Sequence, residues 1–341
     1  MFPLAVALLT ACSASAPASD GEAAATPAAS ATGAVNTDGV AVLATDTVSG
    51  PVSAAASASM GKVPVLMVHL VADTDAVYTI TKARFRHTLE TLYAHGYRPI
   101  TVAQLIDRRI DVPAGKRPVV FTFDDASASQ FRYIERNGQL DVDPESAVGI
   151  WLDFAKKHPD WKPRATFCML SGAEAGRSFF GNKNIEGQKT EWRFRKLQFL
   201  HAQGFELCNH TLWHANLAKY PDAFVQEQIA RGQLAIDSAV PGYKVRTFAL
   251  PLGVWPKNRV LAQRGEWQDP KSGTVTRYDY DAILEVAGGP SVSPFDPTFN
   301  ARSIRRFNVY FNAVDSLIAR LERNGTGYVV GGGPQPVAIK Q

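Results

Sequence analysis

Along the chain from Lys62, short apolar runs alternate with segments of helical period. The runs predict strands over 63–70, 117–125, 164–170, 205–211 and 245–253. The segments between them predict helices over 85–96, 101–109, 145–160, 192–204 and 223–240. The strands are apolar at nearly every position, which is typical of parallel strands covered on both faces. The pattern therefore predicts an α/β fold, with a parallel sheet that is either doubly wound or closed into a barrel.

The segment before Lys62 has a different pattern. Residues 1–12 form an apolar run that ends in Leu-Thr-Ala-Cys and is similar to a bacterial lipoprotein signal, with Cys12 as the lipidated residue. The run lacks the positive charge that opens a signal peptide, so we expect that the true start lies upstream. Residues 13–60 are almost wholly small and polar and predict a disordered tether. We expect an exported lipoprotein of the cell envelope or cell surface, with one catalytic domain over 62–330.

Composition and charge add limits on the partners. The chain has 341 residues, of which 45% are hydrophobic and 20% charged, as in ordinary globular proteins. The net charge of +4 is spread along the chain rather than gathered in one run, which argues against nucleic-acid binding. The basic balance fits either anionic surroundings such as a cell wall or an ordinary solvated surface. We expect a monomer that meets the membrane only through lipid at Cys12.

Two cysteines remain inside the predicted strands. Export would permit a disulfide between Cys168 and Cys208. Because both lie in apolar runs, we expect two small buried thiols instead.

Polar residues stand where four of the predicted strands end. They are His69, the pair Asp124 and Asp125, His210, and the segment 251–253. The carboxyl ends of parallel strands form the active-site face of such folds. These side chains should therefore meet at one rim.

The pair Asp124-Asp125 follows a buried strand directly. Two adjacent carboxylates at the end of a buried strand are costly without a positive partner, and a cation would supply one. One carboxylate would then bind the metal while the other acts as a base. The alternative is a pair that caps the following helix.

His210 and His214 are four residues apart, which would place both imidazoles on one face of a helical turn. With an aspartate from a neighbouring strand they make a set of two nitrogen ligands and one oxygen ligand. Such a set suits Zn²⁺, or Co²⁺ or Ni²⁺ by availability. Three protein ligands leave a position open for water, as in catalytic metal sites.

These motifs carry a resemblance. TFDD at 122–125 and NHTLWH at 209–214 resemble the first two motifs of the polysaccharide deacetylases of carbohydrate esterase family 4, the NodB-like group. The strand at 63–69 is similar to the segment that precedes the catalytic domain of many secreted members, and the similarity runs from about Lys62 to about residue 311.

The resemblance implies a distorted (β/α) barrel of about seven parallel strands. It also implies that Asp124 is the catalytic base and that Asp125, His210 and His214 bind the metal. The third motif of the family aligns with residues 249–253, but its arginine, which orients the base, is missing. Arg246 is close enough in sequence to be a substitute.

The last family motif carries a histidine that protonates the leaving group, and no histidine follows His214. The proton would come from His69 or from the protonated Asp124, and His69 could instead only shape the strand end. Near the missing motif, Arg305 or Arg306 could supply charge but no proton. Because an alcohol leaves more readily than an amine, this loss shifts the prediction slightly from N-deacetylation towards O-deacetylation.

The expected substrate is a polysaccharide or oligosaccharide. The backbone N–H of Leu252 would stabilise the oxyanion. Pro251 and Gly253 would shape the substrate loop. Trp213 and Trp255 would stack on sugar rings, unless they are buried packing residues. The long insertion at 126–163, with a loop-like GQLDVDPES, would wall one side of the groove.

Two functions remain open at this point. The first is an active deacetylase of a cell-envelope or environmental glycan. The second is a degenerate glycan-binding protein that has kept the fold and lost turnover. The ligands and the base favour the enzyme, while the missing arginine and histidine favour the binding protein.

Overall fold

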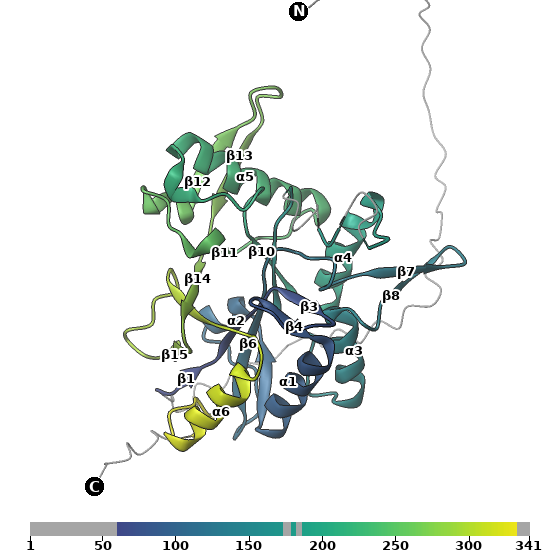
Figure 1. The fold of residues 1–341 in the computed structure, drawn as a ribbon. Coiled ribbons are helices and arrows are strands. Elements are labelled where there is room, and N and C mark those ends of the chain that lie inside the picture. The colour runs from purple at the N-terminus through teal and green to yellow at the C-terminus, as the bar shows by residue number, and fades with distance from the viewer. Residues whose placement is uncertain (1–59, 173–178, 182–185, 333–341) are drawn as a thin grey trace, which may run out of the picture. The chain divides into compact units, whose positions relative to one another are not determined.

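The computed structural model describes residues 60–172, 179–181 and 186–332 (Figure 1). The expected signal with Cys12 and all of the expected tether except Met60 lie outside the described residues. The first strand, β1 (Lys62–Val63), begins where the predicted domain begins. Within the described part of the chain, no helix is both long and apolar enough to cross a bilayer.

Seven parallel strands close into a barrel, which confirms the predicted fold class. In order around the ring they are β2 (Val65–Val68), β16 (Ile304–Asn308), β14 (Ala282–Gly288), β11 (Thr247–Ala249), β10 (Glu206–Asn209), β9 (Thr166–Met169) and β6 (Arg117–Phe123). The ring closes because β6 pairs with β2 as well as with β9. An eighth strand, β5 (Tyr97–Ile100), pairs with the first half of β6. The last residues of β6 pair with β9 instead.

The strands bury both faces, as their unbroken apolar runs predict. On one face, residues such as Phe121, Phe167 and Phe248 pack with the helices in a large core. On the other face, residues such as Val65, Val120 and Leu284 form a second cluster with strand neighbours and with α2 (Val102–Ile106). This second cluster therefore fills the barrel interior, with α2 at the amino ends of the strands.

Five longer helices cover the barrel, and their ends follow local sequence signals. They are α1 (Lys82–Ala94), α3 (Ala147–Lys157), α4 (Arg193–Gln203), α5 (Asp222–Ala239) and α6 (Ala313–Arg323). The Thr81 side chain caps α1 by accepting the Arg84 N–H, and the Ser146 side chain caps α3. Gly204 ends α4 in a left-handed conformation (φ 93°) that glycine adopts without strain.

Several short elements decorate the barrel. Two antiparallel hairpins are β7 (Tyr133–Arg136) with β8 (Gln139–Val142), and β12 (Arg264–Gln268) with β13 (Val275–Asp279). Two small pairings are β3 (Leu70–Ala72) with β4 (Thr79–Thr81), and β1 with β15 (Ser291–Val292). Single 3₁₀ turns are η1 (Thr190–Trp192), η2 (Leu217–Lys219), η3 (Pro251–Gly253) and η4 (Arg259–Ala262).

The insertion at 126–163 is more ordered than predicted. Its GQLDVDPES segment, expected to be a loop, is one only in part, because residues Gln139–Val142 form β8 and pair with β7. The run LDV is too short and too charged to show a strand period, so only the tertiary pairing reveals it. Asp143 and Ser146 then form the turn into α3.

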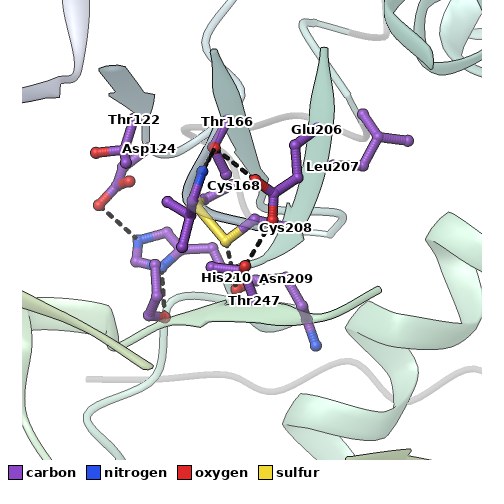
Figure 2. The surroundings of a disulfide bond; sticks show 12 residues. Thr122, Asp124, Thr166, Cys168, Glu206, Leu207, Cys208, Asn209, His210 and Thr247 are labelled. Carbon is purple, nitrogen blue, oxygen red and sulfur yellow. Dashed lines mark hydrogen bonds and ion pairs between the residues drawn. A yellow bond between two sulfur atoms is a disulfide. The ribbon is translucent and has the colours of Figure 1, made fainter. Parts of the chain in front are cut away.

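The two strand cysteines form a disulfide, so the prediction of two free thiols was wrong. Cys168 and Cys208 are direct register partners on the neighbouring strands β9 and β10, and both face the barrel interior (Figure 2). Register across a sheet cannot be read from an isolated apolar run. The bond joins the two strands just below the residues that follow them at the carboxyl end.

The amino end of the barrel buries a carboxylate. Glu206 is the first residue of β10, and its two oxygens accept hydrogen bonds from the first residues of both neighbouring strands (Figure 2). One oxygen accepts from the Thr247 hydroxyl at 2.6 Å, and the other accepts from the Thr166 hydroxyl at 2.8 Å and the Ala103 N–H at 2.9 Å. Both carboxylate oxygens are therefore satisfied by the fold itself, although burial raises the pKa of Glu206.

Candidate active site

The polar residues predicted at the strand ends meet at the carboxyl end of the barrel. One pocket of about 780 Å³ is lined by His69, Asp124, Asp125, His210, His214 and Leu252. Leu70, Tyr78, Ser127, Ala128, Gly181, Glu186, Leu250 and Val286 complete its lining. The fold brings these residues together from segments that are far apart in the chain.

Asp125, His210 and His214 direct their ligand atoms at one point. The Oδ1 atom of Asp125 lies 3.4 Å from His210 Nε2 and 3.6 Å from His214 Nε2. One ligand atom from each residue falls within 4.8 Å of the others. This spacing is short enough for a single ion to contact all three.

The chemistry of this donor set fits a divalent metal. Asp125 Oδ1 and His210 Nε2 are buried, and neither has a hydrogen-bond partner in the described part of the chain. Buried polar atoms without partners are costly, so these two atoms are suited to bind a ligand. The Nδ1 atom of His210 is 2.8 Å from the Ala249 carbonyl oxygen. A proton on Nδ1, donated to that carbonyl, would leave Nε2 free to bind a metal.

The two histidines do not lie on a helical turn, contrary to the prediction. The segment after β10 is a loop in which Thr211 (φ 73°) and His214 (φ 56°) are left-handed. The Asn209 side chain accepts the Thr211 N–H, and the Thr211 hydroxyl accepts the His214 N–H. Two successive hydrogen bonds from backbone to side chain therefore fix the positions of the two imidazoles. The sequence spacing had suggested that a helical turn would do so.

Helix α5 holds this loop from outside the barrel. Gln228 accepts the Leu212 N–H through its backbone and the Trp213 N–H through its side chain. Gly232 lies so close to Asn209 that a Cβ atom there would come within 2.4 Å of the Asn209 side chain. The position of the two histidines thus depends on a close approach between α5 and the loop.

Asp124 is held by an arginine from the last strand of the barrel. Arg306 on β16 donates to both carboxylate oxygens, at 2.7 and 2.8 Å, and also to Thr122 and to the Glu285 carbonyl. Both side chains are almost fully buried. This paired geometry is the strong, orienting form of an arginine–carboxylate contact.

The expectation that Arg246 replaces the missing motif arginine was wrong. Arg246 precedes β11 at the amino end of the barrel, where it binds Asp107 and Asp281. The separate expectation, that Arg305 or Arg306 near the missing histidine motif brings charge to the site, agrees with the position of Arg306. Sequence distance misled here, because β11 separates Arg246 from the carboxyl end.

Burial and charge shift the ionisation of the site in opposite directions. Burial alone would raise the pKa of Asp124, but the Arg306 guanidinium holds it well below its usual range. Burial would also raise the pKa of Asp125, but His210 lowers it. Burial lowers the pKa of His214, with a further contribution from His210. For His210, the carboxylates of Asp124 and Asp125 outweigh burial and raise the pKa. Asp124 is therefore ionised at neutral pH.

His69 lies at the end of β2, on the pocket wall. Its Nδ1 atom is buried and has no partner among the described residues, and burial lowers the pKa of its imidazole. Gln130, fully buried and not singled out from the sequence, donates to the backbone carbonyls of His69 and Asp124 at 2.5 and 2.6 Å. Gln130 thereby ties the ends of β2 and β6 together.

The predicted substrate residues divide between the pocket and its surroundings. Leu252 lines the pocket, is 53% exposed and has a left-handed backbone (φ 56°) in η3. Pro251 and Gly253 flank it, with Gly253 (φ 65°) packed so tightly on Val286 that a side chain would not fit. Trp213 and Trp255 are outside the pocket lining.

The indole of Trp255 is already engaged: its Nε1–H donates to Glu285, and the Arg259 guanidinium covers its ring at 3.9 Å from the centroid. Trp213 is half exposed. Neither of the two tryptophans that the sequence suggested for sugar stacking therefore lines the pocket.

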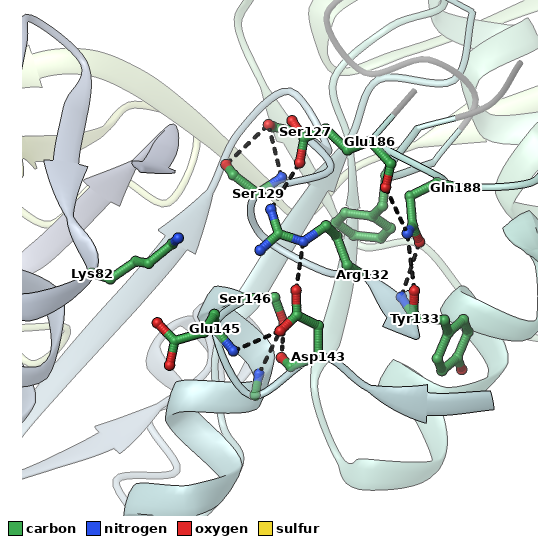
Figure 3. A network of polar contacts seen from close by, with 12 residues as sticks. Lys82, Ser127, Ser129, Arg132, Tyr133, Asp143, Glu145, Ser146, Glu186 and Gln188 are labelled. Carbon is green, nitrogen blue, oxygen red and sulfur yellow. Dashed lines mark hydrogen bonds and ion pairs between the residues drawn. The ribbon is translucent and has the colours of Figure 1, made fainter. Parts of the chain in front are cut away.

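A polar network fixes the other wall (Figure 3). Arg132 lies between two carboxylates, donating to Asp143 at 2.7 Å and to Glu186 at 2.8 Å. Gln188 makes two hydrogen bonds with the backbone of Tyr133, at 2.9 and 3.0 Å. These contacts hold Glu186, which lines the pocket, against the insertion that was expected to form a wall.

Comparisons with known proteins agree with this geometry. Residues 111–265 match the family model described as polysaccharide deacetylase. A search of the curated proteins found no match.

Several solved structures share the fold. A polysaccharide deacetylase from Bacillus cereus is 18% identical with a TM-score of 0.52, over 76% of this chain and 68% of that one. The Streptococcus pyogenes deacetylase PplD, solved with acetate, is 16% identical with a TM-score of 0.52, over 76% of this chain and 97% of that one. IcaB from Ammonifex degensii is 18% identical with a TM-score of 0.50, over the same shares of the two chains. The resemblance seen in the sequence motifs is thus confirmed: residues 111–265 match the polysaccharide deacetylase family, and the barrel has the fold of these solved deacetylases.

Proposed function

We propose that this protein is an exported, metal-dependent deacetylase that hydrolyses acetyl groups from a cell-envelope or environmental polysaccharide. One observation carries the proposal. Three ligand atoms, from Asp125, His210 and His214, converge beside the ionised Asp124 in one pocket. A metal-assisted hydrolase needs this combination of an open metal site and an adjacent proton acceptor.

Asp125, His210 and His214 would hold the metal, with Zn²⁺ favoured and Co²⁺ or Ni²⁺ as alternatives. A bound divalent cation supplies Lewis-acid polarisation and lowers the pKa of water towards about 7. Asp124 would accept the proton of the attacking water, since its Oδ2 atom lies 4.0 Å from His210 Nε2 and therefore faces the same space. Arg306 keeps this carboxylate ionised and fixes its orientation.

The backbone N–H of Leu252 is the proposed donor to the oxyanion. Leu252 lines the pocket, and the turn that carries it is held between β11 and Val286. A donor fixed before the reaction needs no reorganisation as negative charge develops.

The leaving-group proton would come from His69 or back from Asp124. His69 faces both aspartates, but its lowered pKa keeps most of it neutral at pH 7. A shortage of acid would favour ester over amide substrates, because an amine must be protonated before it leaves.

His69→Ala tests this role by comparing substrates. If His69 is the acid, the variant should lose far more activity on N-acetyl oligosaccharides than on activated aryl acetates, whose leaving groups need no proton. Equal losses on both would remove His69 as the acid.

The proposed function is tested by acetate release from chitin oligomers, peptidoglycan, poly-N-acetylglucosamine and acetylxylan, with Zn²⁺, Co²⁺ or Ni²⁺ supplied. The wild-type protein should release acetate from at least one of these, and chelation should stop the release. No release from any substrate with any metal would refute the enzyme.

A glycan-binding protein without turnover is the second candidate. The contact of Arg306 with both oxygens of Asp124 favours it, because a carboxylate paired in this way is a weak base. The absence of a histidine after His214 points the same way. Binding of oligosaccharide without acetate release, in protein that holds its metal, would select this candidate.

The proposed export has independent support. A buried disulfide between Cys168 and Cys208 is typical of proteins that fold in oxidising compartments. We further propose lipid at Cys12 as the anchor. Detergent partitioning tests this part: native protein with an unmodified Cys12 in the aqueous phase would contradict it.

A further inference from the structure

The pocket contains an aromatic side chain that the sequence did not single out. Among the described residues that line the pocket, Tyr78 is the aromatic one apart from the histidines. Trp213 and Trp255, the expected stacking residues, are outside that lining. If sugar stacking occurs in this pocket, Tyr78 is placed to provide it.

Tyr78 occupies an unusual backbone conformation. Its φ of 63° is left-handed, a conformation that a bulky residue seldom adopts because it is strained. Residues keep such strain when the surrounding structure fixes them, and they cluster at binding sites.

The surroundings of Tyr78 do fix it. The Tyr78 carbonyl accepts the Leu70 N–H at 3.1 Å, and the next residue, Thr79, pairs with Ala76 and with β3. The Val71 N–H on β3 in turn donates to the hydroxyl of Ser129, which follows the pocket-lining Ala128 in the chain. Both the strand before Tyr78 and the turn that carries it are therefore anchored to the rim.

The tyrosine ring lies beside the proposed reaction site and is partly exposed to solvent. It meets the His69 ring edge to face, with centroids 4.8 Å apart and planes at 61°. At the same time 44% of the residue is exposed. An anchored, exposed aromatic ring at the mouth of a polar pocket offers an apolar surface to a ligand while the polar groups below bind its acyl end.

We propose that Tyr78 is the ring-stacking, specificity-determining residue of this pocket, which binds the pyranose that carries the scissile acetyl group. The C–H groups on one face of a pyranose carry partial positive charge and complement the negative face of an aromatic ring. The inference rests on the proposed function, because it assumes that the substrate is a glycan. It predicts selectivity for acetylated sugars over acetyl esters that lack a pyranose.

The test compares two substrates in three variants. The N-acetylglucosamine tetramer has pyranose rings, and 4-nitrophenyl acetate has none. In Tyr78→Ala, the ratio of kcat/KM for the tetramer to that for the aryl acetate should fall about tenfold, the usual worth of one aromatic contact. Tyr78→Phe keeps the ring and should hold this ratio within about twofold.

Tyr220→Ala is the matched control. Tyr220 is similarly exposed, at 43%, but packs on Phe224 outside the pocket lining. Its ratio should equal that of the wild type. An unchanged ratio in Tyr78→Ala, with both rates reduced alike, would overturn the proposal and show that Tyr78 acts only by positioning His69.

A binding measurement separates this proposal from the proposed function. If the wild type releases no acetate, the tetramer is titrated into the wild type, Tyr78→Ala and Tyr78→Phe by calorimetry. Binding that is lost in Tyr78→Ala and kept in Tyr78→Phe supports the stacking role although the deacetylase has failed. Equal binding in all three, or no binding by the wild type, overturns it.

Discussion

The two ends of the barrel treat buried polar groups in opposite ways. At the amino end, the oxygens of Glu206 accept three hydrogen bonds from Thr166, Thr247 and the start of α2. At the carboxyl end, His69 Nδ1, Asp125 Oδ1 and His210 Nε2 are buried without partners in the described residues. The same strands supply both ends. A satisfied end holds the fold together, and an unsatisfied end is suited to the proposed metal.

The largest expected effect is at the unsatisfied end. His214→Ala should abolish metal retention, because two ligands do not hold a catalytic metal, while the metal-free protein should change in stability by less than about 1 kcal/mol. Metal content by mass spectrometry and unfolding of the metal-free protein check the two parts. His87→Ala, at an exposed position, is the control. Near-stoichiometric metal in purified His214→Ala would contradict the ligand assignment.

Asp124→Asn should come next, with a loss of about 10²–10⁴ in kcat, the usual worth of general acid–base catalysis. The metal should stay bound, since Asp125 and both histidines remain. Because Arg306 loses its charge partner, circular dichroism must show that the variant is folded. Asp141→Asn on the exposed hairpin serves as the control. Full activity in Asp124→Asn would sink the mechanism.

At the satisfied end the effect should be on stability alone. Glu206→Gln turns an acceptor-only group into one that also donates, so at least one of its three buried donors loses its acceptor. The free energy of unfolding should fall by about 1–3 kcal/mol, while metal content stays that of the wild type. Urea unfolding measures the first, and Glu266→Gln at an exposed site is the control. If Glu206→Gln lost metal but kept its stability, the amino end would not be the purely structural end of the barrel.

Lys196 sharpens the comparison, because it is a buried charge outside both ends. It is fully buried, donates to the Phe180 carbonyl at 2.8 Å, and burial lowers its pKa from 10.5 to about 7. Between these two values the unfolded chain binds more protons, so this residue makes stability rise with pH over that window. Between pH 7 and pH 8, the free energy of unfolding of the wild type should rise by about 1 kcal/mol relative to that of Lys196→Met. Unfolding at several pH values measures this difference, and Lys157→Met is the exposed control. A difference that does not change with pH would show that the pKa of Lys196 is not lowered in the folded protein.

Much of the barrel follows from local pattern. Unbroken apolar runs located the barrel strands β2, β6, β9, β10 and β11, and the side chain of Thr81 and the backbone freedom of Gly204 mark two helix ends. The Asp-Asp and His-x₃-His spacings pointed to the residues that converge in the pocket. The closing strands β14 and β16 and the hairpin β12–β13 were not among the predicted elements.

The features that the sequence did not predict depend on contacts between residues that are far apart in the chain or on the folded backbone. The Cys168–Cys208 bond depends on the register of two strands, and the contact of Arg306 with Asp124 joins residues that are far apart in the chain. Arg246 was favoured because it is near in sequence, although it lies at the wrong end of its strand. Tyr78 gave no signal, since its exposure and strained backbone are properties of the folded chain.

The position of Arg306 has a consequence for how the protein is made. The proposed metal ligands and Asp124 are complete by residue 214, but the guanidinium that orients Asp124 arrives on β16, which pairs with β2 to close the ring. The matched family segment, 111–265, also ends before this strand. A chain that has been synthesised only to β11 therefore contains every proposed metal ligand, but not the arginine that orients the proposed base. Hydrolytic competence would thus be acquired in a single late event, the joining of the last strand to the first.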